Sequence, residues 1–117
     1  MMDAVGIIPR DVASVLVEAA KIAGATVLHS KQINLPCALS KPSSPPGGTA
    51  VVLLDESHIS MHWYDQEDGR AMIALDMFTC GLAEPEKATE YLREVLSLDV
   101  LAEDTKSRFS CVPISIA

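Results

Sequence analysis

The sequence TAVVLLDESHISMHWYDQEDGRAMIALDMFTC, residues 49–80, carries the pattern that decides the fold. Thr49–Leu54 is a continuous β-prone apolar run, and His58–Tyr64 alternates polar and apolar residues with the period of two that is typical of a half-buried strand. A polar turn over 65–70 separates it from Ala71–Cys80, which has the composition of a further strand. The stretch therefore predicts consecutive strands of an antiparallel sheet.

Two amphipathic helices are expected, one before and one after these strands in the sequence. Val12–Ala23 has apolar residues at helical spacing, with Asp11 as the N-cap and Gly24 as the stop. A second helix opens at Pro85 and ends near Ser97. Its predicted apolar stripe consists of Ala88, Tyr91, Leu92 and Val95.

The remaining segments complete an α+β pattern. Ala25–His29 is predicted to be a strand, and Lys31–Gly48, which is rich in Pro and Gly, is predicted to be a long loop. Asp99–Glu103 and Phe109–Ile116 are candidate final strands, whereas Ala4–Ile8 is only an apolar start. We expect an α+β two-layer sandwich, with a mainly antiparallel sheet and helices on one face.

Length and composition limit the classes of function. The 117 residues predict a single domain over 1–117, and a domain of this size has little room for a deep private pocket, so we expect a homodimer or a higher homo-oligomer with its site at a subunit interface. The net charge of −7, without any basic run, argues against a nucleic-acid partner and leaves an acidic surface that attracts cations or merely keeps the protein in solution.

The three cysteines, Cys37, Cys80 and Cys111, are far apart and show no metal-ligand spacing. We therefore expect neither a metal site nor a disulfide framework. No apolar run has the length of a membrane span, and no secretory signal pattern is present. The sequence predicts a cytoplasmic protein without a membrane partner.

The candidate chemistry lies around Ser57. Strand alternation places His58, Ser60 and His62 on one face, next to a serine that has the chemistry of a nucleophile. If the hairpin pairs Tyr64 with Ala71, Ser57 lies opposite Phe78, and Cys80 falls within about two residues of that level. Ser57 and Cys80 are then expected at the same end of the hairpin.

A hydrolase nucleophile is one interpretation of this grouping of Ser, His and Cys. The sequence lacks the G-x-S-x-G elbow, and no strand-to-helix turn is expected after Ser57. Taken singly, each of these residues also fits an ordinary packing or surface role. The residues alone therefore indicate an enzyme-like α+β domain and leave its reaction open.

Two segments resemble known signature blocks. Glu56–His62 (ESHISMH) and Asp76–Gly81 (DMFTCG) are similar to the paired blocks of the prokaryotic S-adenosylmethionine decarboxylase family, which makes the aminopropyl donor for polyamine synthesis, including that of spermidine. The order of elements agrees with the family over roughly Gly24–Asp104. The resemblance implies a self-cleaving zymogen whose pyruvoyl group, formed from its own serine, replaces an external cofactor.

The resemblance also implies roles for individual residues. Cleavage is expected between Glu56 and Ser57, with Ser57 becoming the pyruvoyl group that binds the substrate amine as a Schiff base. His62 and Thr49, where the family usually has serine, are implied to assist processing, and Cys80 is implied to be the catalytic proton donor. Glu56 is also a candidate substrate contact.

The chain departs from the family pattern where the substrate would be recognised. Ser40–Gly48 contains no aromatic residue to stack on adenine, and Trp63–Gln66 replaces Thr-Trp-Pro-Glu. Tyr64 is the candidate substitute platform, because Trp63 is expected on the opposite face from His62. Decarboxylation of S-adenosylmethionine is the main hypothesis; decarboxylation of ornithine or arginine, and a non-catalytic binding relative that is not processed, are the alternatives.

Overall fold

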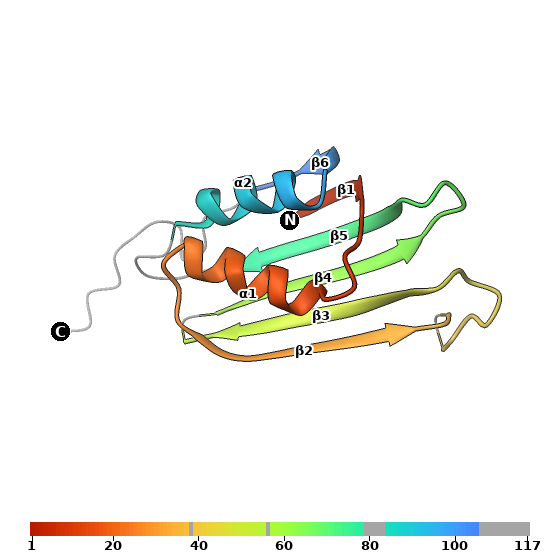
Figure 1. Cartoon of the computed structure of the whole chain (residues 1–117), viewed down its shortest axis with the longest axis horizontal. Helices are drawn as coiled ribbons and strands as arrows, with labels where there is room; N and C mark the ends of the chain where they lie inside the picture. The colour runs from red at the N-terminus through yellow and green to blue at the C-terminus, as the bar shows by residue number, and fades with distance from the viewer. Residues whose placement is uncertain (38, 56, 79–83, 106–117) are drawn as a thin grey trace.

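The structure, a computed structural model, describes residues 1–37, 39–55, 57–78 and 84–105. Six strands and two helices make up this part of the chain (Figure 1). In chain order they are β1 (Met2–Gly6), α1 (Val12–Ile22), β2 (Val27–Leu35), β3 (Gly47–Leu54), β4 (His58–Asp65), β5 (Ala71–Phe78), α2 (Pro85–Val95) and β6 (Asp99–Glu103).

The strands form one sheet in the order β2-β3-β4-β5-β1-β6, and each neighbouring pair is antiparallel. Both helices lie side by side on the same face of this sheet (Figure 1). The predicted α+β two-layer sandwich is therefore confirmed. The face of the sheet turned away from the helices, here called the open face, is covered by no helix in the described residues.

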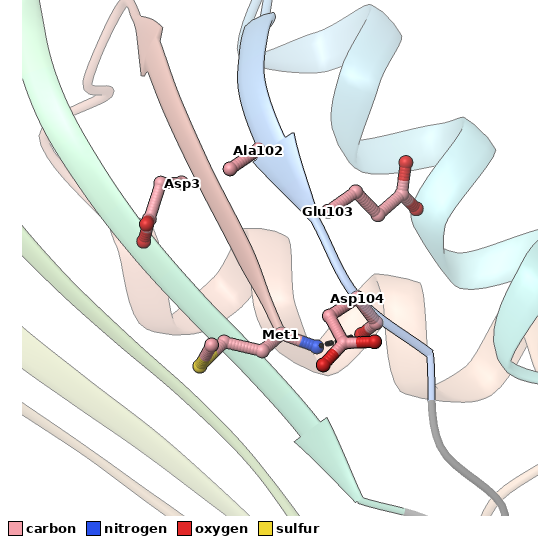
Figure 2. Close-up of a pocket in the computed structure, with 5 residues that line it drawn as sticks. All are labelled: Met1, Asp3, Ala102, Glu103 and Asp104. Atoms are coloured by element: carbon pink, nitrogen blue, oxygen red, sulfur yellow. Dashed lines mark hydrogen bonds between the residues drawn. The ribbon is translucent and has the colours of Figure 1, made fainter.

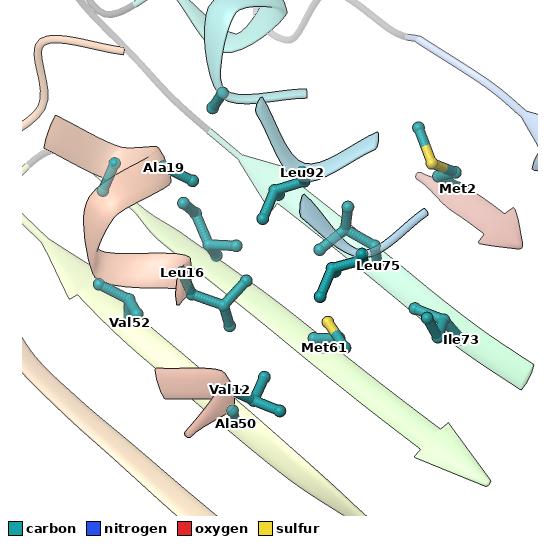
Figure 3. Close-up of a cluster of buried hydrophobic side chains, with 14 of the residues drawn as sticks. Met2, Val12, Leu16, Ala19, Ala50, Val52, Met61, Ile73, Leu75 and Leu92 are labelled. Atoms are coloured by element: carbon teal, nitrogen blue, oxygen red, sulfur yellow. The ribbon is translucent and has the colours of Figure 1, made fainter. Parts of the chain in front are cut away.

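The hydrophobic core fills the space between the helices and the sheet (Figure 3). Helix α1 contributes Val12, Leu16 and Ala19, which lie on one side of the helix because their spacing matches its period. Ile59, Met61 and Trp63 enter from β4, as the alternation predicted. Helix α2 buries Ala88 and Leu92, whereas Val95 is exposed, so that the expected apolar stripe is narrower than predicted.

Both predicted boundaries of α1 are confirmed within one residue. The Asp11 carboxylate accepts hydrogen bonds from the backbone N–H of Ser14 at 3.0 Å and from the Ser14 hydroxyl at 2.7 Å. These bonds favour the charged form and lower the pKa of Asp11. At the other end, Gly24 has a left-handed backbone conformation, with φ of +85°, directly after the helix.

The prediction of a loop over Lys31–Gly48 was wrong at both ends. Strand β2 continues to Leu35, and β3 already begins at Gly47. Because β2 is an edge strand, many of its side chains face solvent and the alternation of apolar residues is weak. One of its polar residues, Gln32, accepts a hydrogen bond from the Ala13 N–H at 2.9 Å at the start of α1.

Two further differences concern strand pairing. The apolar start of the chain is β1, which lies between β5 and β6 and was not predicted as a strand. The β4–β5 hairpin pairs Asp65 with Ala71, so that His58, and not Ser57, lies opposite Phe78. The predicted strand over 109–116 lies outside the described residues, whereas Asp99–Glu103 is confirmed as β6.

Gly48 allows the sheet to pack against the largest side chain of the core. It pairs directly with Trp63, and an added Cβ would clash with the Trp63 indole, including Cε2 at 2.8 Å. The same Cβ would lie 2.8 Å from the backbone oxygen of Ile33 on β2. Because a backbone atom cannot move as freely as a side-chain end, the close approach of β2, β3 and Trp63 requires glycine.

We predict that Gly48→Ala lowers the free energy of unfolding by about 1–3 kcal/mol, the usual cost of overpacking a core. Urea unfolding of the purified variants measures this effect. In a Trp63→Leu background the same substitution is expected to cost less, because one of the two clashes is removed. An unchanged unfolding midpoint in Gly48→Ala would contradict the packing described here.

Candidate active site

Ser57 lies at the end of a tight turn between β3 and β4. The Leu54 N–H donates a hydrogen bond of 2.8 Å to the Ser57 carbonyl, and the ladder continues from the Leu53–His58 pair. Only Asp55 and residue 56 separate these hydrogen-bonded ends. Glu56, on the other side of the expected cleavage site, lies outside the described residues.

The Ser57 hydroxyl oxygen is buried and has no hydrogen-bond partner in the part of the chain that the structure describes. A buried hydroxyl without a partner costs about 1–3 kcal/mol, so such groups are rare and call for an explanation. A hydroxyl held away from water and from competing donors is suited to attack a neighbouring carbonyl. The position therefore fits a serine that is converted into a prosthetic group.

Backbone contacts fix the turn in place. The Asp55 N–H donates to the Thr26 carbonyl at 3.1 Å, in the connection that leads from α1 to β2. On the open face, the His58 and Phe78 rings lie with their centroids 6.1 Å apart, so that the end of β5 packs beside the start of β4. Cys80 follows Phe78 by two residues and lies outside the described residues.

His62 and Thr49 lie directly opposite each other on β4 and β3. His62 is exposed and Thr49 is half-buried, on the open face. The structure thus brings these two expected processing residues together. It does not bring them to Ser57 of the same chain, because five residues of extended strand separate His62 from Ser57, or about 16 Å.

The register places one carboxylate in this region that the sequence analysis did not single out. Asp76 of β5 lies opposite Ser60 and diagonally from His62, and its side chain is exposed. The alternation in β5 indicates that Asp76 shares a face with Met72 and Ala74. Only the strand register of the structure shows which β4 residues lie next to Asp76.

Tyr64 lies at the far end of β4 from Ser57. Seven residues of strand separate the two, or roughly 23 Å. Its side chain is exposed and shares the level of Met72. The hypothesis that Tyr64 stacks on a substrate held at Ser57 of the same chain therefore requires a span longer than one small molecule covers.

One surface pocket lies away from these residues, between the N-terminus and β6 (Figure 2). Met1, Asp3, Ala102, Glu103 and Asp104 line it, and its volume of about 80 Å³ is small for a nucleoside-sized ligand. The terminal amine of Met1 donates to the Asp104 carbonyl at 2.9 Å. In the described ranges, no group of three or more His, Cys, Asp or Glu side chains is arranged to hold a metal ion.

The fold has a counterpart of known structure. The crystal structure of the adenosylmethionine decarboxylase from Aquifex aeolicus VF5 matches with a TM-score of 0.55 and 22% sequence identity, over 91% of this chain and 92% of that one. At this identity the likeness establishes the fold, an α+β two-layer sandwich. It defines the structural class of the protein.

The sequence identifies the family within that class. Residues 8–108 match the family model described as S-adenosylmethionine decarboxylase, and the chain belongs to this family. The S-adenosylmethionine decarboxylase proenzyme of Brevibacillus brevis is 43% identical over 82 residues, which are 69% of this chain and 53% of that protein. The proenzyme of Pyrococcus furiosus is 36% identical over 87 residues, 74% of this chain and 55% of that protein.

These relatives are longer than the present chain. The chain spans about half the length of the curated relatives that it matches.

Neither of the helices in the described residues is long and apolar enough to cross a membrane.

Proposed function

We propose that this chain is a self-processing decarboxylase precursor that acts on S-adenosylmethionine. Membership of the family supports the class of reaction, and the relatives described above are named as proenzymes of S-adenosylmethionine decarboxylase. The single structural observation that supports self-processing is the buried hydroxyl of Ser57, which has no hydrogen-bond partner among the described residues. Decarboxylation of ornithine or arginine has no comparable support, since those relatives are all named for S-adenosylmethionine.

Processing would begin at the turn between β3 and β4. The Ser57 hydroxyl attacks the Glu56 carbonyl carbon, and the amide C–N bond breaks, which leaves an ester and a free Ser57 amine. Removal of the Ser57 α-proton then expels the Glu56 carboxylate and leaves dehydroalanine. Tautomerisation and addition of water release ammonia, and the pyruvoyl group remains on residue 57.

The carbonyl of the pyruvoyl group, once formed, would supply an electron sink for the loss of CO2. The roles left to the side chains are proton transfers. His62 is the proposed base that takes the Ser57 α-proton, with the Thr49 hydroxyl beside it, and Cys80 is the proposed donor to the substrate carbon. Glu56 becomes the C-terminus of the first fragment and remains a candidate substrate contact.

We predict that wild-type protein separates into two fragments, 1–56 and 57–117, and releases CO2 from S-adenosylmethionine. Ser57→Ala should remain one chain and release none, because alanine has no hydroxyl for the acyl shift. Mass spectrometry under denaturing conditions and CO2 release measure the two effects. An intact wild-type chain would favour the non-catalytic alternative, and a cleaved, active Ser57→Ala would rule out the pyruvoyl mechanism.

The active site is proposed to form between two copies of the chain. The separation of about 16 Å along β4 argues against His62 acting on Ser57 of the same chain. The open face supports pairing with a second copy because it exposes large apolar side chains. They are Ile33 (46% exposed), Leu53 (44%), Tyr64 (51%) and Met72 (43%). Packing of two open faces would bury these side chains and bring His62 of one copy toward Ser57 of the other.

This arrangement predicts that two inactive variants rescue each other. Alone, His62→Ala is expected to process about 100-fold or more slowly, the usual contribution of a positioned base. Co-expressed with Ser57→Ala, which keeps His62, the His62→Ala chain should be cleaved in the mixed oligomer. The two chains carry different tags, and intact masses give the cleaved fraction of each.

The matched control for this rescue is co-expression of His62→Ala with the double variant Ser57→Ala/His62→Ala, which supplies no histidine. Cleavage should then stay at the level of His62→Ala alone. If the two single variants form a mixed oligomer and the His62→Ala chain stays intact, His62 acts within its own chain and the proposed arrangement is wrong.

Tyr64 of the second copy is the proposed adenine platform. A platform within the same chain is disfavoured by the distance of roughly 23 Å from Ser57, whereas a facing copy allows the approach. The net charge of −7 is compatible with a substrate that carries a sulfonium cation. The cytoplasmic location expected from the sequence remains a prediction.

We predict that Tyr64→Ala lowers kcat/KM for S-adenosylmethionine by about 5- to 150-fold, the equivalent of 1–3 kcal/mol for base–aromatic stacking. Met72→Ala, which removes the exposed cross-strand neighbour, is the control and should have a smaller effect. Both variants are assayed with S-adenosylmethionine, ornithine and arginine offered in competition. A preference for ornithine or arginine that Tyr64→Ala leaves unchanged would contradict the substrate assignment.

A further inference from the structure

The connection between α1 and β2 holds the turn before Ser57 and the N-terminal end of α2 by backbone hydrogen bonds. Its Thr26 carbonyl accepts the Asp55 N–H at 3.1 Å, in the turn that precedes Ser57. Its Ala23 carbonyl accepts the Glu84 N–H at 2.8 Å, and Glu84 is the first described residue after the segment that contains Cys80. Only Gly24 and Ala25 lie between the two residues that carry these anchoring carbonyls.

The orientation of these carbonyls depends on how α1 ends. The Gly24 N–H donates to the Lys21 carbonyl at 3.0 Å, and the Ala25 N–H donates to the Ala20 carbonyl at 3.0 Å. This pair of bonds is the Schellman motif, which places the residue after the C-cap in the left-handed conformation. Gly24 occupies that position with φ of +85°, where an L side chain is strained.

Besides ending α1, the motif influences the orientation of the two anchoring carbonyls. A change of backbone conformation at Gly24 would turn the Ala23 and Thr26 carbonyls relative to each other. Because Ala23 holds Glu84 and Thr26 holds Asp55, such a change would shift the turn before Ser57 relative to Glu84, the N-cap of α2. Displacement of reacting groups by about 1 Å can cost on the order of 100-fold in rate.

We propose that residues 23–26 form a backbone clamp that positions the turn at 54–57 for self-cleavage, with Gly24 as its positioning residue. This inference rests on the proposed self-processing and adds a requirement that the resemblance to the family does not supply. The clamp acts through main-chain carbonyls only. Its loss should therefore slow cleavage more than it lowers the stability of the fold.

Gly69 offers a matched control. It also has a left-handed conformation, with φ of +80°, and an added Cβ at either glycine would meet no atom of the described residues within 4 Å. Alanine at each position therefore introduces the same kind of backbone strain without a clash. Gly69 lies in the turn between β4 and β5, at the other end of β4 from Ser57.

The test compares the cleavage time courses of wild-type protein, Gly24→Ala and Gly69→Ala, by mass under denaturing conditions, with the Tm of each variant. We expect Gly24→Ala to cleave at least about tenfold more slowly than Gly69→Ala at similar Tm. Gly24→Asn should recover much of the rate, because asparagine tolerates the left-handed conformation. If wild-type protein cleaves and the two alanine variants cleave at equal rates, the clamp is overturned and the proposed function is not.

A second pair of variants tests the same contact if Gly24→Ala fails to fold. Asp55→Pro removes the N–H that Thr26 accepts, and Asp55→Ala keeps it. Among the described non-glycine residues only Ser97 has a positive φ, so the φ of Asp55 lies on the negative side, as proline requires. Slower cleavage of Asp55→Pro than of Asp55→Ala supports the clamp, and equal cleavage overturns it. A wild-type chain that never cleaves overturns both the clamp and the proposed function.

Discussion

The antiparallel pairing of β4 between β3 and β5 is the constraint on which the rest of the structure depends. Because the strand has a period of two, burial of Ile59, Met61 and Trp63 against the helices leaves His58 and His62 on the open face. A slip of one residue would exchange the two sets, burying imidazoles and exposing core residues. Packing of the core therefore fixes which face of the sheet carries the chemistry.

The same pairing determines what a cut after residue 56 would do to the fold. Fragment 1–56 would contain β1, β2, β3 and α1, and fragment 57–117 would contain β4, β5, α2 and β6. In the sheet, β3 of the first fragment pairs with β4 of the second, and β1 of the first lies between β5 and β6 of the second, so the strands of the two fragments are interleaved. The helices also pack on each other. Hydrogen bonds and core contacts would hold the fragments together after the covalent link is lost.

The buried position of the Ser57 hydroxyl carries an energetic cost and is the basis of its proposed role in self-cleavage. Within the described part of the chain this buried hydroxyl has no hydrogen-bond partner, and the surrounding sheet and backbone contacts supply the stability that this requires. The second half of the proposed chemistry lies on the open face, beyond the reach of the same chain's Ser57. In the proposed arrangement a single copy presents two partial sites, and the exposed apolar side chains of the open face provide a physical reason for two copies to combine.

The sequence by itself determined the elements with strong local signals. The helix bounded by Asp11 and Gly24, the alternating strand over 58–64 and the turn around Gly69 all follow from capping, side-chain period and turn chemistry within a few residues. The resemblance to the family also identified Ser57 and His62 as candidates, because both lie within the single block Glu56–His62.

Only the tertiary structure decided what depends on contacts between distant segments. The strand character of β1 and of the second half of β2 comes from pairing with β5, β6 and β3, which no local pattern encodes. The register that sets His58 against Phe78 is fixed by core packing over the whole hairpin. The separation of Ser57 from His62 arises because an extended strand turns five residues of sequence into about 16 Å, so that neighbours in sequence are not neighbours in the site.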